Sequence, residues 1–136
     1  AYSFEPDAAI AIDATPANDL PSSFDMDISP NTQLGYGPAI YISTRTMLSD
    51  PRLVKHAITV AEQNNLPYQI RQPGGGGTNM GSIIPSRSGV PSLSISVPTR
   101  YIHSPVSLLQ LSDLRHTIDL VRETAAQLTP KTLRRT

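Results

Sequence analysis

The sequence contains no cysteine among its 136 residues. Disulfides and thiolate metal sites are therefore excluded, and the composition fits a reducing compartment. Any metal that the side chains of this protein bind must be held by carboxylates and imidazoles.

The sequence also lacks an excess of either charge and any long apolar run. Eleven Lys and Arg residues balance eleven Asp and Glu residues, so nothing suggests a nucleic-acid-binding surface or an affinity for anionic membranes. No apolar run approaches the roughly 18 residues that a membrane span needs, and the opening residues show no signal-peptide pattern. We therefore expect a cytoplasmic protein that uses neither nucleic acid nor membrane as a partner.

The length fits one domain or a large piece of one, and a hydrophobic content of 38% is enough to form a core. The chain opens on Ala1 instead of a methionine and reaches its first predicted strand within a few residues. We expect a fragment or a processed product, with a trimmed natural N-terminus as the alternative.

Strand patterns alternate with helix patterns along the chain. Four runs predict strands, at residues 8–12, 39–44, 68–72 and 92–97. A capping Ser49-Asp50 followed by Pro51 predicts a helix that ends near Asn64-Asn65, and a short helix is expected to open near residues 78–81. Residues 16–38 form a loop longer than most connections, which hints at function.

The last helix is predicted from one apolar stripe after a Ser112 cap. The stripe comprises Leu111, Leu114, Ile118, Val121, Ala125 and Leu128. Pro130 should end the helix and leave a frayed tail. The whole pattern predicts an α/β three-layer sandwich with a mixed, largely parallel sheet, in which residues 1–129 belong to the domain and residues 130–136 form the tail.

Two side chains stand just past predicted buried strands, where ligands bind in open α/β sheets. Asp13 offers a carboxylate, although a helix-cap or turn role is the alternative and Asp19 competes for the same position. His103 offers an imidazole, the commonest protein ligand for zinc. These two residues alone cannot complete a catalytic zinc site, which needs about three protein ligands.

A run of four glycines, Gly74 to Gly77, precedes Thr78 and Asn79. It matches neither a phosphate-binding loop ending in Gly-Lys-Ser/Thr nor a dinucleotide fingerprint with its downstream acid. Glycines here would let the main chain of a substrate approach the backbone closely, and a plain flexible loop is the alternative.

Five segments, in this order, resemble motifs of the glutamyl and deblocking aminopeptidase family of dinuclear metallopeptidases, which includes the tetrahedral aminopeptidases. They are Ile12-Asp13-Ala14-Thr15, Asp19-Leu20-Pro21, Leu34-Gly35-Tyr36-Gly37-Pro38, Gly75-Gly76-Gly77-Thr78-Asn79-Met80 and Pro98 through Pro105. The last segment is identical to the family motif over eight residues, and agreement runs from about residue 8 to about residue 128. The resemblance implies the C-terminal half of a zinc-peptidase-like catalytic domain.

Position by position, the resemblance implies that Asp13 is a ligand of one metal and His103 a ligand of the other. The substrate-binding residues that it implies are Gly75, Gly76, Gly77, Thr78, Asn79 and Arg100. Arg100 has an equal alternative, an ion pair with a structural carboxylate. The family's other ligands and its general base, a glutamate, would precede Ala1, so we expect no hydrolysis by this chain alone.

The activity implied by the resemblance is removal of N-terminal residues from peptides by an enzyme that uses two divalent ions, zinc or cobalt. Its implied partners are the N-terminal half of the same catalytic domain and further copies in a homo-oligomer. Asn79 stands where the family has an aspartate, which should alter substrate preference or weaken activity. A non-catalytic family member that serves peptide binding or assembly is the alternative.

Overall fold

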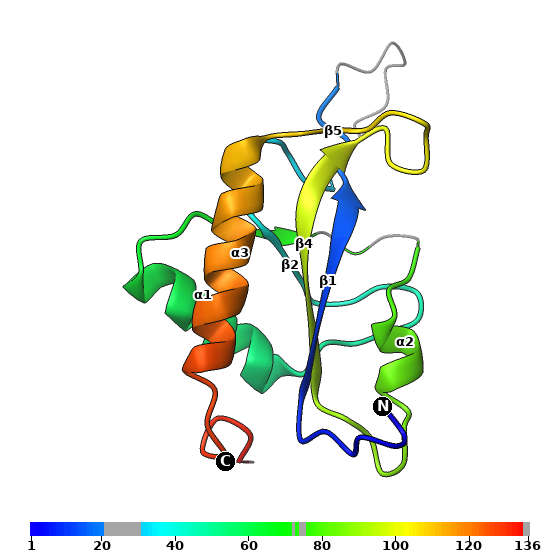
Figure 1. Cartoon of the computed structure of the whole chain (residues 1–136), viewed down its shortest axis with the longest axis vertical. Coiled ribbons are helices and arrows are strands. Elements are labelled where there is room, and N and C mark those ends of the chain that lie inside the picture. Colours follow the sequence, from blue (N-terminus) through cyan, green and yellow to red (C-terminus); the bar gives the residue numbers. More distant parts are fainter. Residues whose placement is uncertain (21–30, 72, 74–75, 135–136) are drawn as a thin grey trace.

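A computed structural model of the chain describes residues 1–20, 31–71, 73 and 76–134. Strands alternate with helices as the sequence predicts (Figure 1). The elements are β1 (Ala9–Pro16), β2 (Ala39–Tyr41), α1 (Pro51–Gln63), β3 (Gln69–Arg71), α2 (Met80–Ile83), β4 (Ser92–Arg100), β5 (Leu108–Leu109) and α3 (Leu111–Ala126). None of the helices in the described ranges is long and apolar enough to cross a membrane.

The strands form one mixed sheet in the order β1-β4-β2-β3, and β5 pairs with the end of β4. β1 runs parallel to β4, with Ala9 opposite Ser92 and Pro16 opposite Thr99. β2 and β3 are parallel to each other, whereas β2 and β5 are antiparallel to β4. The predicted mixed sheet is therefore confirmed, and Asp13 lies in the parallel pair β1 and β4.

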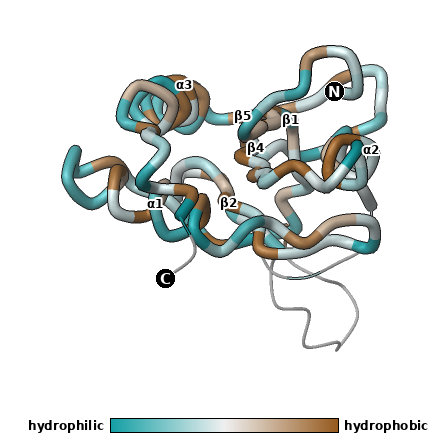
Figure 2. Tube along the Cα trace, turned by 90° about the horizontal axis from the view of Figure 1, so that it is seen from below, coloured by the Kyte–Doolittle hydropathy of each residue, from teal (hydrophilic) through white to brown (hydrophobic). Residues whose placement is uncertain are grey.

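Helices cover both faces of the sheet, as the three-layer prediction requires. α1 and α3 pack on one face, and α2 packs on the other (Figures 1 and 2). Side chains alternate along a strand, so Ile10 of β1 packs against the core beneath α1 and α3. Its neighbours Ala9 and Ala11 pack instead against the smaller cluster around Met80.

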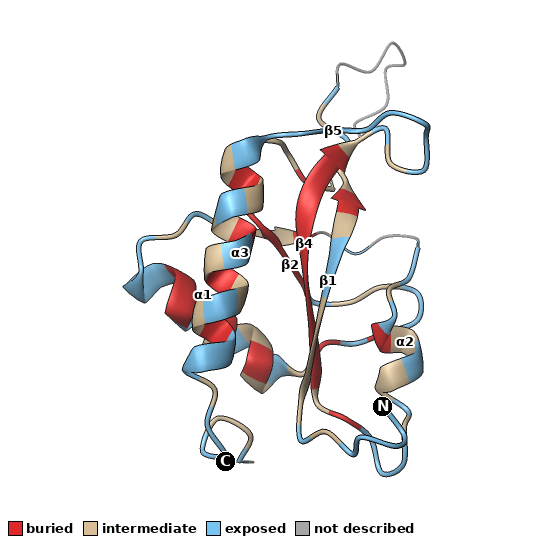
Figure 3. Cartoon of the chain, in the orientation of Figure 1, coloured by how far each residue is buried: buried red, intermediate tan, exposed pale blue. Residues whose placement is uncertain are grey.

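β1 differs from the buried strand that the sequence predicts. Ile12 is 62% exposed, Asp13 is exposed, and the strand continues beyond Asp13 to Pro16. The physical reason is position: among the described residues β1 pairs with β4 alone, so its outer edge is uncovered (Figure 3). Asp13 therefore lies within the exposed part of an edge strand and not just past a buried one.

α1 begins where the capping pattern predicts. The Asp50 carboxylate accepts a hydrogen bond from the backbone N–H of Arg52 at 2.9 Å, and Pro51 occupies the first turn. Leu53 and Ala57 are fully buried on the inner face of the helix.

α3 begins two residues earlier than a Ser112 cap requires, because Gln110 is the N-cap residue. Its buried row is also different from the predicted stripe, and consists of Asp113, Thr117, Leu120 and Thr124. Val121 and Leu128 of the stripe pack against the core, but Leu111 and Ile118 are 64% and 57% exposed, so the predicted stripe is out of phase there. Two of the polar residues in the buried row are hydrogen-bonded: Asp113 accepts from the distant N–H groups of Gly35 and Gly37, and the Thr117 hydroxyl donates to the Asp113 carbonyl at 2.7 Å.

The described residues after α3 are not frayed as predicted. Residues 130–133 form turns, Leu133 packs against the main core, and the guanidinium of Arg52 donates a hydrogen bond to the Leu133 carbonyl. These two contacts hold Leu133 against the domain. The division into a domain at 1–129 and a tail at 130–136 stays a prediction.

Candidate metal and substrate site

Asp13 points to the face of the sheet that α2 covers, because Ala9 and Ala11 of the same strand pack on that side. It stands opposite Ser96 of β4. One carboxylate oxygen, Oδ1, accepts a hydrogen bond from the adjacent N–H of Ala14 at 2.8 Å. The hydroxyls of Ser94 and Ser96 are buried and have no hydrogen-bond partner within the described residues. A solvent-facing carboxylate thus adjoins unused hydroxyl groups.

His103 lies in the turn that connects β4 to β5, and its side chain is exposed. The turn places Tyr101 and His103 at φ 61° and 65°, a left-handed conformation that costs residues with a Cβ about 1–2 kcal/mol. The Ser104 hydroxyl lies 2.6 Å from the carbonyl oxygens of Tyr101 and Val106 and so stabilises the turn. Across the described part of the chain the imidazole makes no hydrogen bond. Such strain is concentrated at functional sites.

The two candidate ligands come to the same end of the sheet. β1 and β4 are parallel, so their carboxyl ends meet, and the His103 turn follows β4 directly. In Figure 1 this turn lies beside the tip of β1. No group of three or more His, Cys, Asp or Glu side chains able to hold a metal occurs within the described ranges. The chain presents two donors at one edge without completing a site.

Arg100 and Asp19 form an ion pair with each other. The Arg100 Nε donates to Asp19 Oδ1 at 2.7 Å, and Asp19 Oδ2 accepts the N–H of Leu34 at 2.9 Å. The hydrogen bond from Arg100 lowers the pKa of Asp19, which partial burial opposes. The geometry favours the ion-pair alternative for Arg100 and makes Asp19 a structural residue.

Asp113, which the sequence reasoning missed, anchors the turn before β2. Its side chain is fully buried, and its two oxygens accept the N–H groups of Gly35 and Gly37 at 2.7 and 3.0 Å. Gln69 of β3 adds hydrogen bonds to the carbonyls of Gln33 and Gly37 at 2.9 and 2.8 Å. We call residues 33–37 the anchored turn. Nothing in the sequence distinguishes Asp113 from an ordinary first-turn acid.

The glycine-rich segment packs closely against Thr46. Gly75 lies outside the described residues. A side chain at Gly77 or Gly81 would place its Cβ 2.8 or 2.9 Å from the Thr46 hydroxyl oxygen, too close for either residue to be other than glycine without movement. Gly76 has open space around it. This part of the predicted substrate wall is shaped by contact with the segment before α1.

Thr78 and Asn79 continue the same wall toward α2. The Thr78 hydroxyl donates to the Met47 sulfur at 3.3 Å and accepts the N–H of Met80 at 3.3 Å. Asn79 is exposed, and its side chain makes no capping hydrogen bond to α2. Thr78 therefore holds the wall in place, while the amide of Asn79 faces solvent.

Arg71 is a second residue that the sequence reasoning missed. It is buried on β3, its Nε donates to the Thr15 hydroxyl at 3.1 Å, and its guanidinium lies 4.6 Å from the centre of the Tyr41 ring. Thr15 follows Asp13 on the same face of β1. A buried cation thus lies on the sheet face of the candidate site. The alternating pattern of residues around β3 does not indicate that Arg71 is buried.

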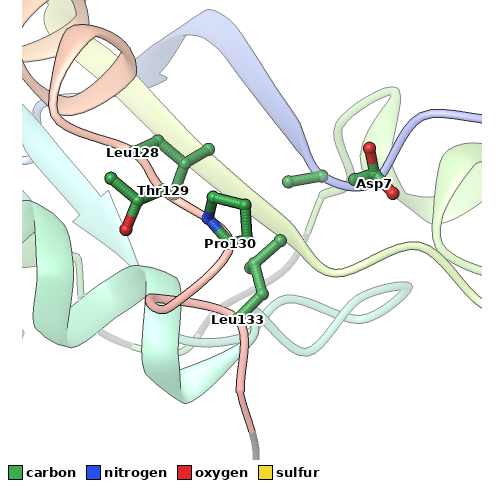
Figure 4. A pocket seen from close by; sticks show the side chains of 6 residues that line it. Asp7, Leu128, Thr129, Pro130 and Leu133 are labelled. Atoms are coloured by element: carbon green, nitrogen blue, oxygen red, sulfur yellow. The ribbon is translucent and has the colours of Figure 1, made fainter.

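One cavity lies away from these donors. A space of about 580 Å³ opens between the start of β1 and the turn after α3 (Figure 4). It is lined by Asp7, Ala8, Leu128, Thr129, Pro130 and Leu133. Asp13 and His103 lie at the opposite, carboxyl end of β1. We therefore place the candidate site by its donors and not by cavity size.

The fold is that of aminopeptidases. An aminopeptidase from the archaeon Desulfurococcus kamchatkensis matches with a TM-score of 0.89 and 36% identity, over 96% of this chain and 37% of that one. A TET aminopeptidase from a marine-sediment Thaumarchaeota archaeon matches with a TM-score of 0.88 and 37% identity, over 96% of this chain and 36% of that one.

The family profile of the M42 glutamyl aminopeptidases matches residues 1–120, and the chain belongs to this family. A putative aminopeptidase of Acetivibrio thermocellus is 39% identical over 123 residues, which make up 90% of this chain and 36% of that protein. The lysyl aminopeptidase of Pyrococcus furiosus is 29% identical over 95% of this chain and 36% of its own length. The chain spans about a third of the length of these relatives.

Proposed function

We propose that this chain supplies part of the active site of a metal-dependent aminopeptidase, with Asp13 as a ligand of one metal and His103 as a ligand of the other. The observation that carries the proposal is that both donors are exposed at the carboxyl end of the same parallel strand pair, β1 and β4. Membership of an aminopeptidase family supports the reaction class.

The donor chemistry fits divalent metal ions such as zinc or cobalt, but the donor set is incomplete. A carboxylate and an imidazole are suitable ligands, and the unpartnered Ser96 hydroxyl opposite Asp13 is suited to orient that carboxylate. The described residues supply no third ligand beside them. Two divalent ions held there would act as Lewis acids on the scissile carbonyl. The other ligands and the general base come, in this proposal, from a segment outside this chain.

The glycine-rich segment is proposed as the wall against which the peptide substrate lies. Gly76 and Gly77 expose backbone without side chains, and Thr46 lies too close to Gly77 to leave room for a side chain there. Asn79 presents a neutral amide where the family motif has an acid, so this wall attracts a cationic N-terminal group less strongly. Arg100 is not included, because Asp19 binds it.

The open side of β1 is the proposed docking edge for the other half of the catalytic domain. The chain matches about a third of the length of its relatives, and β1 has no partner on its outer side within the described ranges. Exposed Ile12 stands on this edge. A strand added here would bury Ile12 and bring further side chains beside Asp13.

The proposal extends to compartment and assembly. We propose a cytoplasmic enzyme that forms homo-oligomers, because a related TET1 peptidase of Pyrococcus horikoshii assembles into a tetrahedron or a large octahedral shell. A non-catalytic, peptide-binding or assembly role is the second candidate, and the neutral Asn79 is the observation that favours it.

The test measures metal content and chelator-sensitive hydrolysis of aminoacyl-4-nitroanilides by the longest natural form of the protein. We expect about two divalent ions per chain. Asp13→Ala and His103→Ala should each reduce activity by more than the roughly 10–100-fold that loss of a residue behind a metal ligand costs. Asp7→Ala, at an exposed aspartate away from the site, is the matched control. Metal-free protein without chelator-sensitive activity would exclude the peptidase and leave the binding role.

A further inference from the structure

One row of side chains on β4 is polar although it is buried. Leu93 and Ile95 pack in the main core on one face of this strand. Ser94 and Ser96 alternate with them, so these two serines face the side of the sheet that α2 covers. Both serines are fully buried, and β4 is buried at every residue except its last (Figure 3).

The hydroxyls of these two serines differ from the hydroxyl of Ser92 at the start of the row. Ser92 donates to the carbonyl of Val90 at 2.7 Å. The hydroxyls of Ser94 and Ser96 have no hydrogen-bond partner within the described residues. A buried hydroxyl without a partner costs stability, because it has lost its hydrogen bonds to water. A partner that the hydroxyl gains in the working protein would offset that cost.

The residues that stand opposite on β1 distinguish the two serines. Ser96 is the register partner of Asp13, whereas Ser94 stands opposite Ala11. Paired strands lie about 4.8 Å apart, so rotation of the two side chains is enough to bring the Ser96 hydroxyl and the Asp13 carboxylate within hydrogen-bond distance. In the structure Asp13 Oδ1 accepts the N–H of Ala14, and within the described ranges no second donor binds the carboxylate. Of the two unpartnered serines, only Ser96 has a carboxylate opposite it.

We infer that Ser96 is a positioning residue for Asp13, and that its hydroxyl donates to the carboxylate when Asp13 holds a metal ion. The inference rests on the proposed function, in which Asp13 is a ligand of one ion and His103 is a ligand of the other. A hydrogen bond to a carboxylate ligand fixes its orientation and so strengthens metal binding. Because His103 lies in the turn beyond β4, the Ser96 hydroxyl should act on one of the two ions only.

A structural role for the Ser96 hydroxyl predicts a different result in the metal-free protein. A hydroxyl that stabilises the fold has a partner there, and its removal lowers stability. A hydroxyl that gains its partner only with the metal has none, so Ser96→Ala should leave the urea midpoint of the metal-free protein unchanged or raise it. Ser94→Ala should behave in the same way, since it removes an equally buried and unpartnered hydroxyl.

Titration with Zn²⁺ in competition with a chromogenic chelator tests the inference on the longest natural form of the protein. Ser96→Ala should weaken one of the two binding steps by about 10–100-fold and leave the other unchanged. Ser94→Ala, on the same strand and face, is the matched control and should leave both steps unchanged. Ser96→Thr retains the hydroxyl and should keep most of the affinity that Ser96→Ala loses. In an Asp13→Ala background, Ser96→Ala should have no further effect.

The outcomes separate this inference from the proposed function. If the unchanged protein binds no divalent ion, both are excluded. If it binds metal, equal affinities in the Ser94→Ala and Ser96→Ala variants overturn the inference and leave the proposed function intact. A lower urea midpoint for metal-free Ser96→Ala also overturns the inference, because the hydroxyl would then have a structural partner. So does a loss of affinity that persists in the Asp13→Ala background.

Discussion

We call the carboxyl end of β1 and β4, which carries Asp13 and His103, the donor edge. The anchored turn and the donor edge use an aspartate in opposite ways. At the anchored turn, Asp113 is fully buried and both of its oxygens bind backbone N–H groups. At the donor edge, Asp13 is exposed and, among the described residues, accepts a hydrogen bond from the neighbouring N–H of Ala14 alone. A carboxylate saturated by the backbone stabilises a fold, whereas one with unused oxygens remains able to bind a cation.

The largest effect should follow from Gly37→Ala in the anchored turn. Gly37 has φ 82°, and an added Cβ would lie 2.4 Å from the Pro67 carbonyl oxygen. Backbone strain and the clash together should lower the free energy of unfolding by at least about 3 kcal/mol. Gly76→Ala is the matched control, since Gly76 has φ 86° but open space, and should cost only about 1 kcal/mol. Equal losses in urea denaturation would show that the close approach to Pro67 is unimportant.

The next largest effect on stability should follow from replacing the Asp113 carboxylate. Asp113→Asn replaces one acceptor oxygen by a donor and leaves an N–H of the anchored turn unsatisfied in a buried position. The free energy of unfolding should fall by about 2 kcal/mol. Asp119→Asn on the same helix, where the carboxylate pairs with Arg122 at the surface, should change it by less than about 0.5 kcal/mol. If Asp113→Asn leaves the free energy of unfolding unchanged, the anchored turn is held mainly by Gln69.

A smaller effect is the acid dependence of stability. The pKa of Asp19 is lowered below its unfolded value of 3.8 by Arg100, so the ion pair stabilises the fold above that pH. This contribution is lost as the pH falls through the lowered pKa. Asp19→Asn and Arg100→Gln should each flatten the decline of the urea midpoint below pH 4, and the double variant should behave like either single one. Additive changes would show that the two groups act on different partners.

The smallest effect should be a gain in stability when His103, in the turn after β4, is replaced by glycine instead of alanine. His103→Gly relieves a left-handed backbone at φ 65°, whereas His103→Ala retains the Cβ that causes the strain. The glycine variant should be more stable than the alanine variant by about 0.5–1 kcal/mol, because relief of strain exceeds the added entropy of the unfolded chain. Thermal denaturation of the two variants measures the difference. If the alanine variant is as stable as the glycine variant, the backbone at His103 is not strained. Strain would then give no support to a role of His103 as a metal ligand.

The sequence predicted those elements whose signals are local. The capping Asp50 and Pro51 located the start of α1, and apolar runs located β1 and β4. The phase of α3 could not be predicted, because Asp113 is buried by partners 76 and 78 residues away along the chain. A buried carboxylate needs such hydrogen-bond partners, and the spacing of apolar residues along a sequence does not reveal them.

The candidate site was predictable in its residue types and only partly in its surroundings. Asp13 and His103 come to one end of the sheet, since Asp13 lies in the second half of β1 and His103 follows the end of β4, which runs parallel to β1. Tertiary contacts decided the rest: Arg100 binds Asp19, and Arg71 is buried against Thr15 and Tyr41. Neither contact has a signature in sequence spacing, because each joins segments from different elements of the fold.

The outer edge of β1 has a consequence for the behaviour of this chain in solution. This eight-residue strand has no strand partner on its outer side in the part of the chain that the structure describes, and an unpaired edge is a template for any extended segment that meets it. Ile12 adds an apolar side chain to that edge, and no lysine, arginine or proline interrupts the strand before Pro16. Left uncovered, this edge makes the chain prone to β-type aggregation and a ready target for chaperones. The same exposure would favour rapid binding of the proposed other half of the catalytic domain.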